Sequence, residues 1–295
     1  MKKGHYQYIG LAYIAPWLIG LFVFQLYPLV SSLWYSLTNY AFINEAAFVG
    51  PRNYVTAFTK DVNFMKSLSV TLLYVFTAVP AKLVMAMLVA LLLNRKLRGT
   101  YLFRTVYYLP SILGASVAVS ILWRFLFMKE GYINNIIAAL GLPAVDWTGR
   151  PDTALFTISL ITVWQFGSSM VLYLAALKQV PAELYESAHI DGAGRLRRFF
   201  QISLPMISPV VFFTLVMQLI SGFQDFTAPL LVTSGGPAKA TYLFGLMLYD
   251  NAFRFFKMGY AAALSWVLFA IILVVTGIIF RFSNVMVYYE DGGKH

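Results

Sequence analysis

Long apolar stretches separated by short polar connections form the main pattern of this chain. Six stretches have the roughly 20 residues that a helix needs to cross the hydrocarbon core of a bilayer. They run approximately over Ile9–Leu37, Leu68–Leu93, Thr105–Phe127, Ala154–Leu177, Met206–Phe226 and Met258–Phe280. We therefore predict an all-α membrane protein with six transmembrane helices, forming a single membrane domain over residues 1–295.

Residues 181–205 interrupt this pattern with a charged segment punctuated by glycines. Pro181 is suited to the start of a helix, where its missing N–H would have no partner, and Glu183 and Glu186 place negative charge near the positive end of that helix. Gly192 permits a sharp turn after Asp191. A second helical run is expected over 195–202, so the segment predicts helix, turn, helix.

Composition supports a membrane protein and excludes several other classes. Hydrophobic residues make up 60% of the chain and charged residues 12%, whereas about a quarter of the residues of a soluble domain are charged. There are no cysteines, so disulfide frameworks, thiolate zinc sites and cysteine nucleophiles are ruled out. We assign the net charge of +10 to membrane orientation and anionic lipid, and expect no nucleic-acid partner.

Basic residues predict the orientation. The connection 94–104 contains four lysines and arginines and no acid, and the chain begins with Lys2 and Lys3. Because positive charge concentrates on the cytoplasmic side, both should face the cytoplasm. Six crossings then place the 181–205 segment and the C-terminus on the same side. The first apolar stretch is too long for the core of a cleaved signal peptide, so we expect it to remain as a helix.

The 181–205 segment resembles the cytoplasmic signature of permease subunits of bacterial ABC importers. The matching positions, with every spacing kept, are Glu186, Ala188, Gly192, Ile202, Leu204 and Pro205. Ser187 stands where that family most often has alanine. Further motifs resemble the maltose-type carbohydrate permeases in their first-subunit branch, among them Ala15–Gly20, Tyr27-Pro28, Phe48–Gly50 with Asn53-Tyr54, Leu109-Pro110, Gly131 with Asn134, and Thr233–Pro237 with Thr241.

This resemblance implies a type I importer fold and a set of partners: a second permease, two ABC ATPase subunits and an extracytoplasmic sugar-binding protein. The chain contains no G-x-x-x-x-G-K-[ST] phosphate-binding loop, so ATP and Mg²⁺ are expected in the ATPase partners and no catalytic site is expected here. The 181–205 segment is then a coupling loop. We expect ATPase-coupling residues at Glu183, Glu186, Ala188, Asp191, Gly192, Ile202, Leu204 and Pro205.

Other roles for this segment remain open. Glu183 and Glu186 are alternatively solvated loop residues, and Asp191 is alternatively a cap of the turn or a partner of Arg195. The three arginines at 195, 197 and 198 are expected against lipid phosphates rather than on the ATPase.

Lys82 is the outstanding candidate for the substrate path. It lies about 12 residues, or roughly 18 Å, from the cytoplasmic end of its helix, near the middle of a ~30 Å core. Facing lipid there would cost roughly 2.5 to 3.5 kcal/mol, so we expect Lys82 to face an aqueous cavity or a partner acid. It either attracts an anionic sugar group, such as a uronate or phosphate, or forms an ion pair with the other permease.

Polar residues in the fourth and fifth apolar stretches form a second candidate set. By the resemblance, these stretches match regions where maltose-type permeases contact sugar, and amides and hydroxyls beside Trp164 and Phe166 suit a carbohydrate. The alternative is hydrogen bonding between helices. The candidates are Gln165, Ser168, Gln218, Ser221, Gly222 and Asp225.

Two further questions stay open at this point. The three histidines, at 5, 189 and 295, are too dispersed for a metal or triad site within the membrane. A secondary transporter or channel using Lys82 and Asp225 for coupling is the alternative function, although it leaves the 181–205 segment unexplained. The substrate is expected to be an oligosaccharide, with acidic, neutral and glycerol-phosphate compounds all open.

Overall fold

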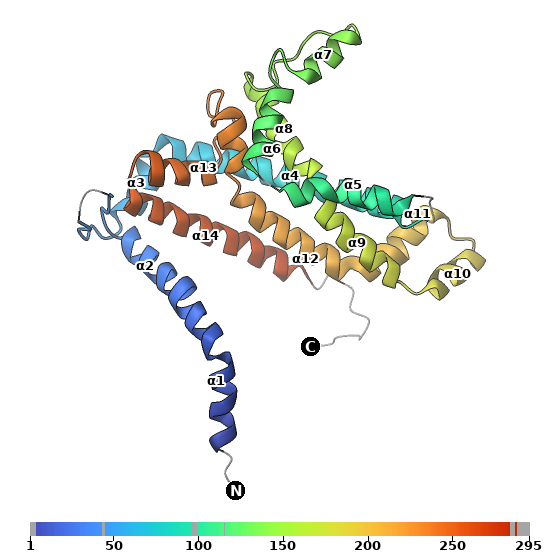
Figure 1. The fold of residues 1–295 in the computed structure, drawn as a ribbon, viewed down its shortest axis with the longest axis horizontal. Coiled ribbons are helices and arrows are strands. Elements are labelled where there is room, and N and C mark those ends of the chain that lie inside the picture. The colour runs from blue at the N-terminus through green and yellow to red at the C-terminus, as the bar shows by residue number, and fades with distance from the viewer. Residues whose placement is uncertain (1–3, 43–44, 96–98, 115, 284–286, 288–295) are drawn as a thin grey trace. The chain divides into compact units, whose positions relative to one another are not determined.

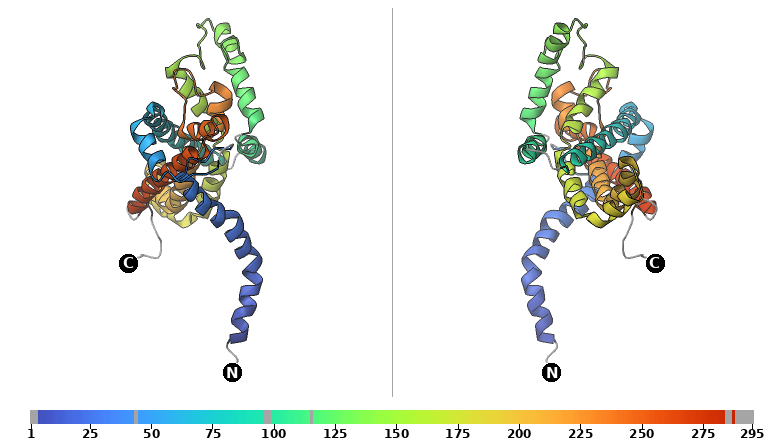
Figure 2. Two further views of the ribbon diagram at one scale, coloured as in Figure 1. Left: turned by 90° about the vertical axis from the view of Figure 1, so that its left-hand side faces the viewer. Right: turned by 90° about the vertical axis from the view of Figure 1, so that its right-hand side faces the viewer.

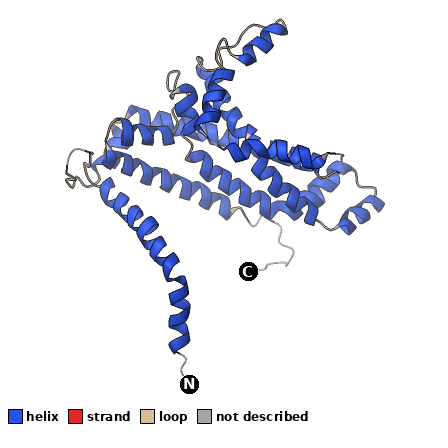
Figure 3. Ribbon diagram, in the orientation of Figure 1, coloured by secondary structure: helices blue, strands red, loops and turns tan. Residues whose placement is uncertain are grey.

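The chain folds into helices joined by short connections. The computed structural model describes residues 4–42, 45–95, 99–114, 116–283 and 287. Within these residues every regular element is a helix, and an isolated bridge pairs Thr38 with Phe48 (Figure 3). The predicted all-α class is confirmed.

Fourteen α-helices and four π-helical segments lie in the described part of the chain (Figure 1). The α-helices are α1 (Gly4–Leu21), α2 (Tyr27–Ser36), α3 (Arg52–Thr59), α4 (Val62–Leu93), α5 (Thr100–Leu113), α6 (Val117–Leu126), α7 (Tyr132–Ala139), α8 (Pro151–Trp164), α9 (Gly167–Gln179), α10 (Ala182–Ile190), α11 (Arg195–Arg198), α12 (Leu204–Phe223), α13 (Phe244–Tyr249) and α14 (Met258–Arg281). The π-helical segments are Phe22–Leu26, Phe199–Ser203, Pro229–Thr233 and Asp250–Arg254.

Proline explains the wide turns before α2 and α12. Pro28 and Pro205 lie within the first two residues of these helices, just after a π-helical segment. A proline has no N–H to donate to the carbonyl four residues earlier, and its ring crowds that carbonyl. The preceding turn widens, as it commonly does at such positions, and the helical path continues through it.

Four helical runs are long and apolar enough to cross a membrane: Tyr13–Ser36, Val62–Leu93, Arg195–Phe223 and Met258–Arg281. Two bent helix pairs, α5 with α6 and α8 with α9, raise the number to six if each pair counts as one span. The predicted stretches Leu68–Leu93 and Met258–Phe280 lie inside α4 and α14. The predicted stretch Met206–Phe226 lies in α12 except for its last three residues.

Two of the predicted spans each consist of two helices. The stretch Thr105–Phe127 consists of α5 and α6, whose axes are bent by 105°. The stretch Ala154–Leu177 consists of α8 and α9, bent by 43°. Apolar runs reveal the length of a span but not a change in its direction. At the first break, the Ser116 hydroxyl accepts a hydrogen bond from the Val119 N–H and so caps the start of α6.

The chain divides into two compact units, and the first comprises residues 1–62 and 248–270. In this unit Asn53 donates from its side chain to the carbonyls of Ser36 and Thr38, both at 2.8 Å. Tyr54 shares a hydrogen bond of 2.7 Å with Ser36 Oγ. The motif Asn53-Tyr54 therefore fastens α3 to the end of α2.

The second unit comprises residues 63–247 and 271–295. Its helices α9 and α12 lie side by side in Figure 1 and in both views of Figure 2, and Tyr173 OH on α9 shares a 2.7 Å hydrogen bond with Thr214 on α12. Helix α5 packs on the start of α9 so closely that a Cβ on Gly167 would lie 2.3 Å from the Tyr107 carbonyl. These contacts hold the helices that carry the candidate site.

The connections of the second unit are fastened by the remaining sequence motifs. Asn134 donates to the carbonyls of Lys129 and Val145 and accepts from Trp147 Nε1 at 3.0 Å, which closes the connection between α7 and α8. Thr241 shares a 2.6 Å hydrogen bond with Thr233 and donates to the Gly236 carbonyl. Both motifs stabilise the connections in which they lie.

Candidate functional site

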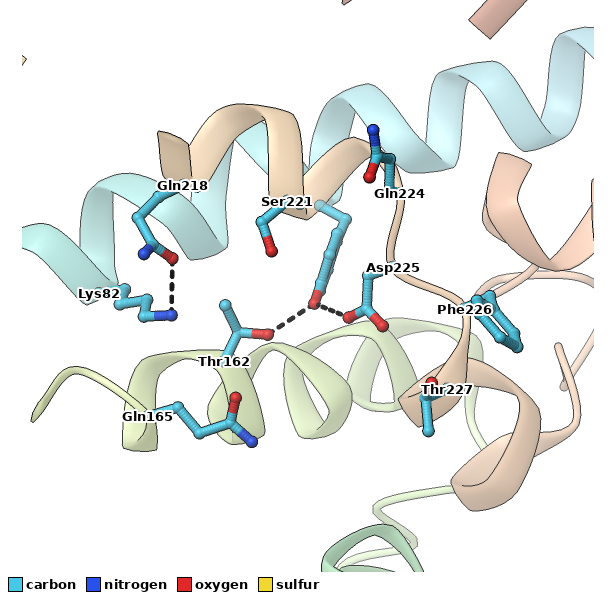
Figure 4. A pocket seen from close by; sticks show the side chains of 11 residues that line it. Lys82, Thr162, Gln165, Gln218, Ser221, Gln224, Asp225, Phe226 and Thr227 are labelled. Atoms are coloured by element: carbon cyan, nitrogen blue, oxygen red, sulfur yellow. Dashed lines mark hydrogen bonds between the residues drawn. The ribbon is translucent and has the colours of Figure 1, made fainter. Parts of the chain in front are cut away.

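A polar cavity of about 290 Å³ lies within the second unit, among α4, the α8–α9 break and the end of α12 (Figure 4). Amides, hydroxyls and one residue of each charge make up most of its lining. The lining residues are Tyr74, Lys82, Thr162, Gln165, Gln218, Ser221, Gly222, Gln224, Asp225, Phe226 and Thr227.

Lys82 is held in the cavity by a neutral partner. Its side chain projects from α4, with 8% of the residue exposed, and Nζ donates to Gln218 Oε1 on α12 at 2.7 Å. Among the described residues it forms no salt bridge, with Asp225 or any other acid. A lysine ammonium has three donors, so two remain for a molecule that enters the cavity.

Tyr74 on α4 links this helix to α8 and to the segment that follows α12. Its hydroxyl donates to Asp225 Oδ2 at 2.6 Å and lies 2.6 Å from Thr162 Oγ1 on α8. Since the one hydroxyl proton of Tyr74 goes to Asp225, the Thr162 hydroxyl must donate to Tyr74. Two of the dashed lines in Figure 4 mark these bonds, which run from Thr162 to the hydroxyl of the unlabelled Tyr74 and on to Asp225.

The Asp225 carboxylate accepts hydrogen bonds from neighbouring groups of the protein. Besides Tyr74, it accepts from the backbone N–H groups of Thr227 and Ala228, where the chain re-enters a helical turn. This is the arrangement of a helix cap. Gly245 on α13 packs closely against the backbone of Asp225, since a Cβ there would lie 2.7 Å from the Asp225 carbonyl oxygen.

Gln165 lies at the break between α8 and α9. Its side-chain Nε2 donates to the Gly114 carbonyl at 2.9 Å, and its own carbonyl accepts from Ser111 Oγ at 3.0 Å. These bonds to the end of α5 hold the break in place and leave the Gln165 side chain on the cavity wall. Broken helices commonly mark binding sites in transporters because they direct backbone and side-chain groups into the protein.

Helices α4 and α12 meet tightly behind the cavity. Gly222 is buried, and a Cβ there would lie 3.1 Å from Val79 and 3.4 Å from Val75. The glycine therefore permits the close approach that brings Gln218 within reach of Lys82. Ser221 is exposed, and in Figure 4 its hydroxyl points toward the space between the two hydrogen-bonded groups.

The 181–205 segment has a defined turn. Helix α10 ends at Ile190, and Gly192 then adopts the left-handed region with φ +73°. The N–H of Gly192 donates to the His189 carbonyl and that of Ala193 to the Ala188 carbonyl. This pair of bonds is the Schellman motif, in which the left-handed residue is usually glycine. The way α10 ends thus explains Gly192, whereas Ala188 contributes only its backbone carbonyl.

The rest of this segment differs from the prediction in one respect. Pro181 precedes α10, as predicted, but the second helix is not separate: α11 and the π-helical segment run on into α12 as one path from Arg195 to Phe223. Tyr185 on α10 shares a 2.8 Å hydrogen bond with Ser203 on this path. Helix α10 is therefore tied directly to a candidate membrane-spanning helix.

Glu183, Glu186, Asp191 and Gly192 are all exposed, and among the described residues none of the three acids forms a salt bridge. Asp191 caps the end of α10 rather than pairing with Arg195. Ile202 in the π-helical segment and Leu204 and Pro205 at the start of α12 are half-buried.

Comparison with known proteins decides the family. The profile of the binding-protein-dependent transport system inner membrane component matches residues 54–288. The chain belongs to this family. Two relatives agree: the probable ABC transporter permease YesP of Bacillus subtilis is 43% identical over 96% of this chain and 92% of its own length. The sn-glycerol-3-phosphate transport permease UgpA of Shigella flexneri is 35% identical over 94% of both chains.

Other relatives of this permease extend the comparison. The sulfoquinovosyl glycerol transport permease SmoG of Agrobacterium fabrum is 32% identical over 91% of this chain and 88% of its own. A crystal structure of a bacterial ABC transporter involved in the import of the acidic polysaccharide alginate superposes with a TM-score of 0.82, covering 95% of this chain and 96% of the other. At 22% identity this likeness shows the fold, which is that of an ABC importer permease.

The structure of the permease brings together most of the predicted path residues and separates one. Lys82, Gln165, Gln218, Ser221, Gly222 and Asp225 line the one cavity, whereas Ser168 lies outside its lining and donates its backbone N–H to Ser111. Ser168 follows the break and turns toward α5. Sequence reasoning missed Tyr74, although it lies two steps of four residues before Lys82 and so on the same face of α4.

Proposed function

We propose that this permease forms half of the translocation path of an ATP-driven sugar importer and that its substrate carries an anionic group. Supporting this, Lys82 is a cation placed far from both ends of α4, and among the described residues its ammonium donates to a single amide oxygen, that of Gln218. A charge at such depth is costly unless it serves a path or a partner. An anionic substrate group approaching the cavity would meet two unused N–H donors.

The remaining lining suits a polyhydroxylated compound. Gln165 presents an amide from the α8–α9 break, Gln218 and Ser221 present an amide and a hydroxyl from α12, and Thr227 presents a further hydroxyl. A few convergent polar groups fix the orientation of a ligand in such a site. Three similar proteins are named for sulfoquinovosyl glycerol, sn-glycerol-3-phosphate and the acidic polysaccharide alginate, each of which carries an anionic group.

Replacing Lys82 tests the anionic substrate. In Lys82→Met, uptake of an acidic sugar should fall about tenfold or more, the range expected for a lost hydrogen bond to a charged group, while uptake of its neutral analogue should change little. Lys66→Met is the matched control, since Lys66 lies on the same helix but is exposed. Equal losses for the acidic and neutral sugars in Lys82→Met would contradict the assignment.

We further propose that the 181–205 segment couples the permease to an ATPase subunit. The supporting observations are the exposed acids of α10, the fixed turn at Gly192 and the Tyr185–Ser203 bond, which together make α10 a rigid projection attached to α12. Movement of α10 on a partner would then reach the helix that bears Gln218. A second permease, a second ATPase subunit and cytoplasmic termini complete this proposal.

A further inference from the structure

A second cavity of about 660 Å³ lies where α4 ends and the Arg195–Phe223 path begins. We call it the basic cavity, and its lining includes Arg95, Arg195 and Arg198. Both helices that form it are candidate membrane spans, and the arginines lie at their ends. The ends of spanning helices lie at the level of the lipid headgroups, so the basic cavity lies there too.

The charge of the basic cavity is uncompensated within the described structure. None of its lining residues is acidic, and none of the three arginines forms a salt bridge with a described acid. Arg197, on the same short helix, does not line the cavity, and its Nε donates to Gln201 at 2.9 Å. Three guanidinium groups around one space favour an anion with several oxygens, such as a phosphate.

Part of the lining of the basic cavity is apolar, and this restricts the kind of anion that fits. Leu88, Leu91, Phe199 and Phe200 line it, and Leu88 and Phe200 remain 53% and 60% exposed. A soluble phosphate would leave these side chains uncovered. A molecule with a phosphate joined to hydrocarbon chains would satisfy the arginines and cover the leucines and phenylalanines together.

We propose that the basic cavity binds an anionic phospholipid, with the phosphate on Arg95, Arg195 and Arg198 and an acyl chain along Leu88 and Leu91. Basic pockets between membrane helices recognise lipid headgroups in this way. Tyr185 also lines the cavity, so a bound lipid would contact α10 as well as α12. Lipid composition would thereby influence the 181–205 segment.

The test uses the complete transporter, delipidated and titrated with dioleoyl phosphatidylglycerol or dioleoyl phosphatidylcholine, with bound lipid counted by native mass spectrometry. The wild type should retain phosphatidylglycerol preferentially. Arg195→Gln and Arg198→Gln should each weaken its binding about fivefold, from about one kcal/mol for each basic residue near a membrane surface. Arg197→Gln is the matched control and should change it by less than about twofold.

Two further arms separate the sources of the anion. Leu91→Asn should weaken phosphatidylglycerol binding. It should leave the dissociation constant of soluble glycerophosphoglycerol unchanged, since only the lipid contacts the apolar part of the lining. The inference is overturned if phosphatidylcholine binds equally well or if Arg197→Gln has the same effect as Arg198→Gln. It is also overturned if the arginine variants release the ATPase subunits while lipid binding is unchanged, because the cavity would then belong to that interface.

Discussion

At the residue scale, the hydroxyl of Tyr74 connects α4 to α8 and to the segment after α12. Its donor bond goes to Asp225, which also accepts from two backbone N–H groups. A buried hydrogen-bonded chain of this kind holds its members in one geometry, and loss of one member leaves the others unsatisfied. Tyr74 therefore positions the wall of the polar cavity that faces Lys82.

Tyr74→Phe should destabilise the permease more than another loss of a buried tyrosine hydroxyl. The lost bond to a carboxylate is expected to cost about 1.5–3 kcal/mol, against about 0.5–1.5 kcal/mol for a bond between neutral groups. Tyr173→Phe is the matched control, because Tyr173 is equally buried and bonds to Thr214. Thermal unfolding of the purified transporter measures both, and an equal or smaller effect in Tyr74→Phe would refute the role.

Residues of the cavity were predictable from the sequence where a polar side chain interrupts an apolar stretch. A lysine in the middle of an apolar stretch and polar groups in two others stand out from the sequence, and the cavity contains most of them. Tyr74 does not stand out, since tyrosine is common in membrane helices and only its partners reveal its role. Ser168 lies outside the lining of this cavity, because the break before it redirects the chain toward α5.

At the element scale, α10 and its turn form the best-defined feature outside the apolar helices. The end of α10 is closed by two backbone bonds that require the left-handed conformation of Gly192. The sequence predicted this turn from its glycines. The continuity of α11 with α12 was not predictable, because a proline such as Pro205 also marks a helix start, and only the structure shows that a π-helical turn accommodates it within one path.

Gly192→Val should uncouple ATP hydrolysis from transport without loss of membrane insertion. A side chain in the left-handed conformation costs roughly 1–2 kcal/mol, and more for a β-branched residue. No atom lies within 4 Å of a Cβ there, so we expect backbone strain in the turn and no clash of the added Cβ. Uptake and ATPase association should both fall.

The matched control is Gly194→Val, two residues further on. Gly194 has equally open surroundings but a φ of −67°, which a side chain adopts without strain. Uptake should stay near that of the wild type in this variant. Equal effects of the two substitutions, or normal uptake and ATPase association in Gly192→Val, would show that the turn has no coupling role.

At the scale of the whole molecule, the apolar stretches revealed the number of candidate spans but not their shape. Four are continuous helical runs, and the other two are bent pairs. The end of α5, beside one bend, is hydrogen-bonded to the α8–α9 break at the other, and these bonds join residues more than 50 positions apart. Hydrophobic pattern carries no information about such bonds.

Membrane topology is testable because the chain has no cysteine. Ser187→Cys on α10 and Glu130→Cys before α7 are both at exposed positions. We expect a membrane-impermeant thiol reagent to label Glu130→Cys in intact cells and to label Ser187→Cys only after permeabilisation. Labelling of Ser187→Cys from outside would reverse the orientation that the basic residues predict.

This permease is expected to work in a binding-protein-dependent, ATP-driven importer. The most direct test is uptake of labelled sugar into proteoliposomes that contain the permease with its second permease and ATPase subunits. Uptake is predicted to require ATP inside the vesicles and the binding protein outside, and to persist without any ion gradient. Uptake driven by an ion gradient without ATP, and abolished in Asp225→Asn, would contradict the account and indicate a secondary transporter.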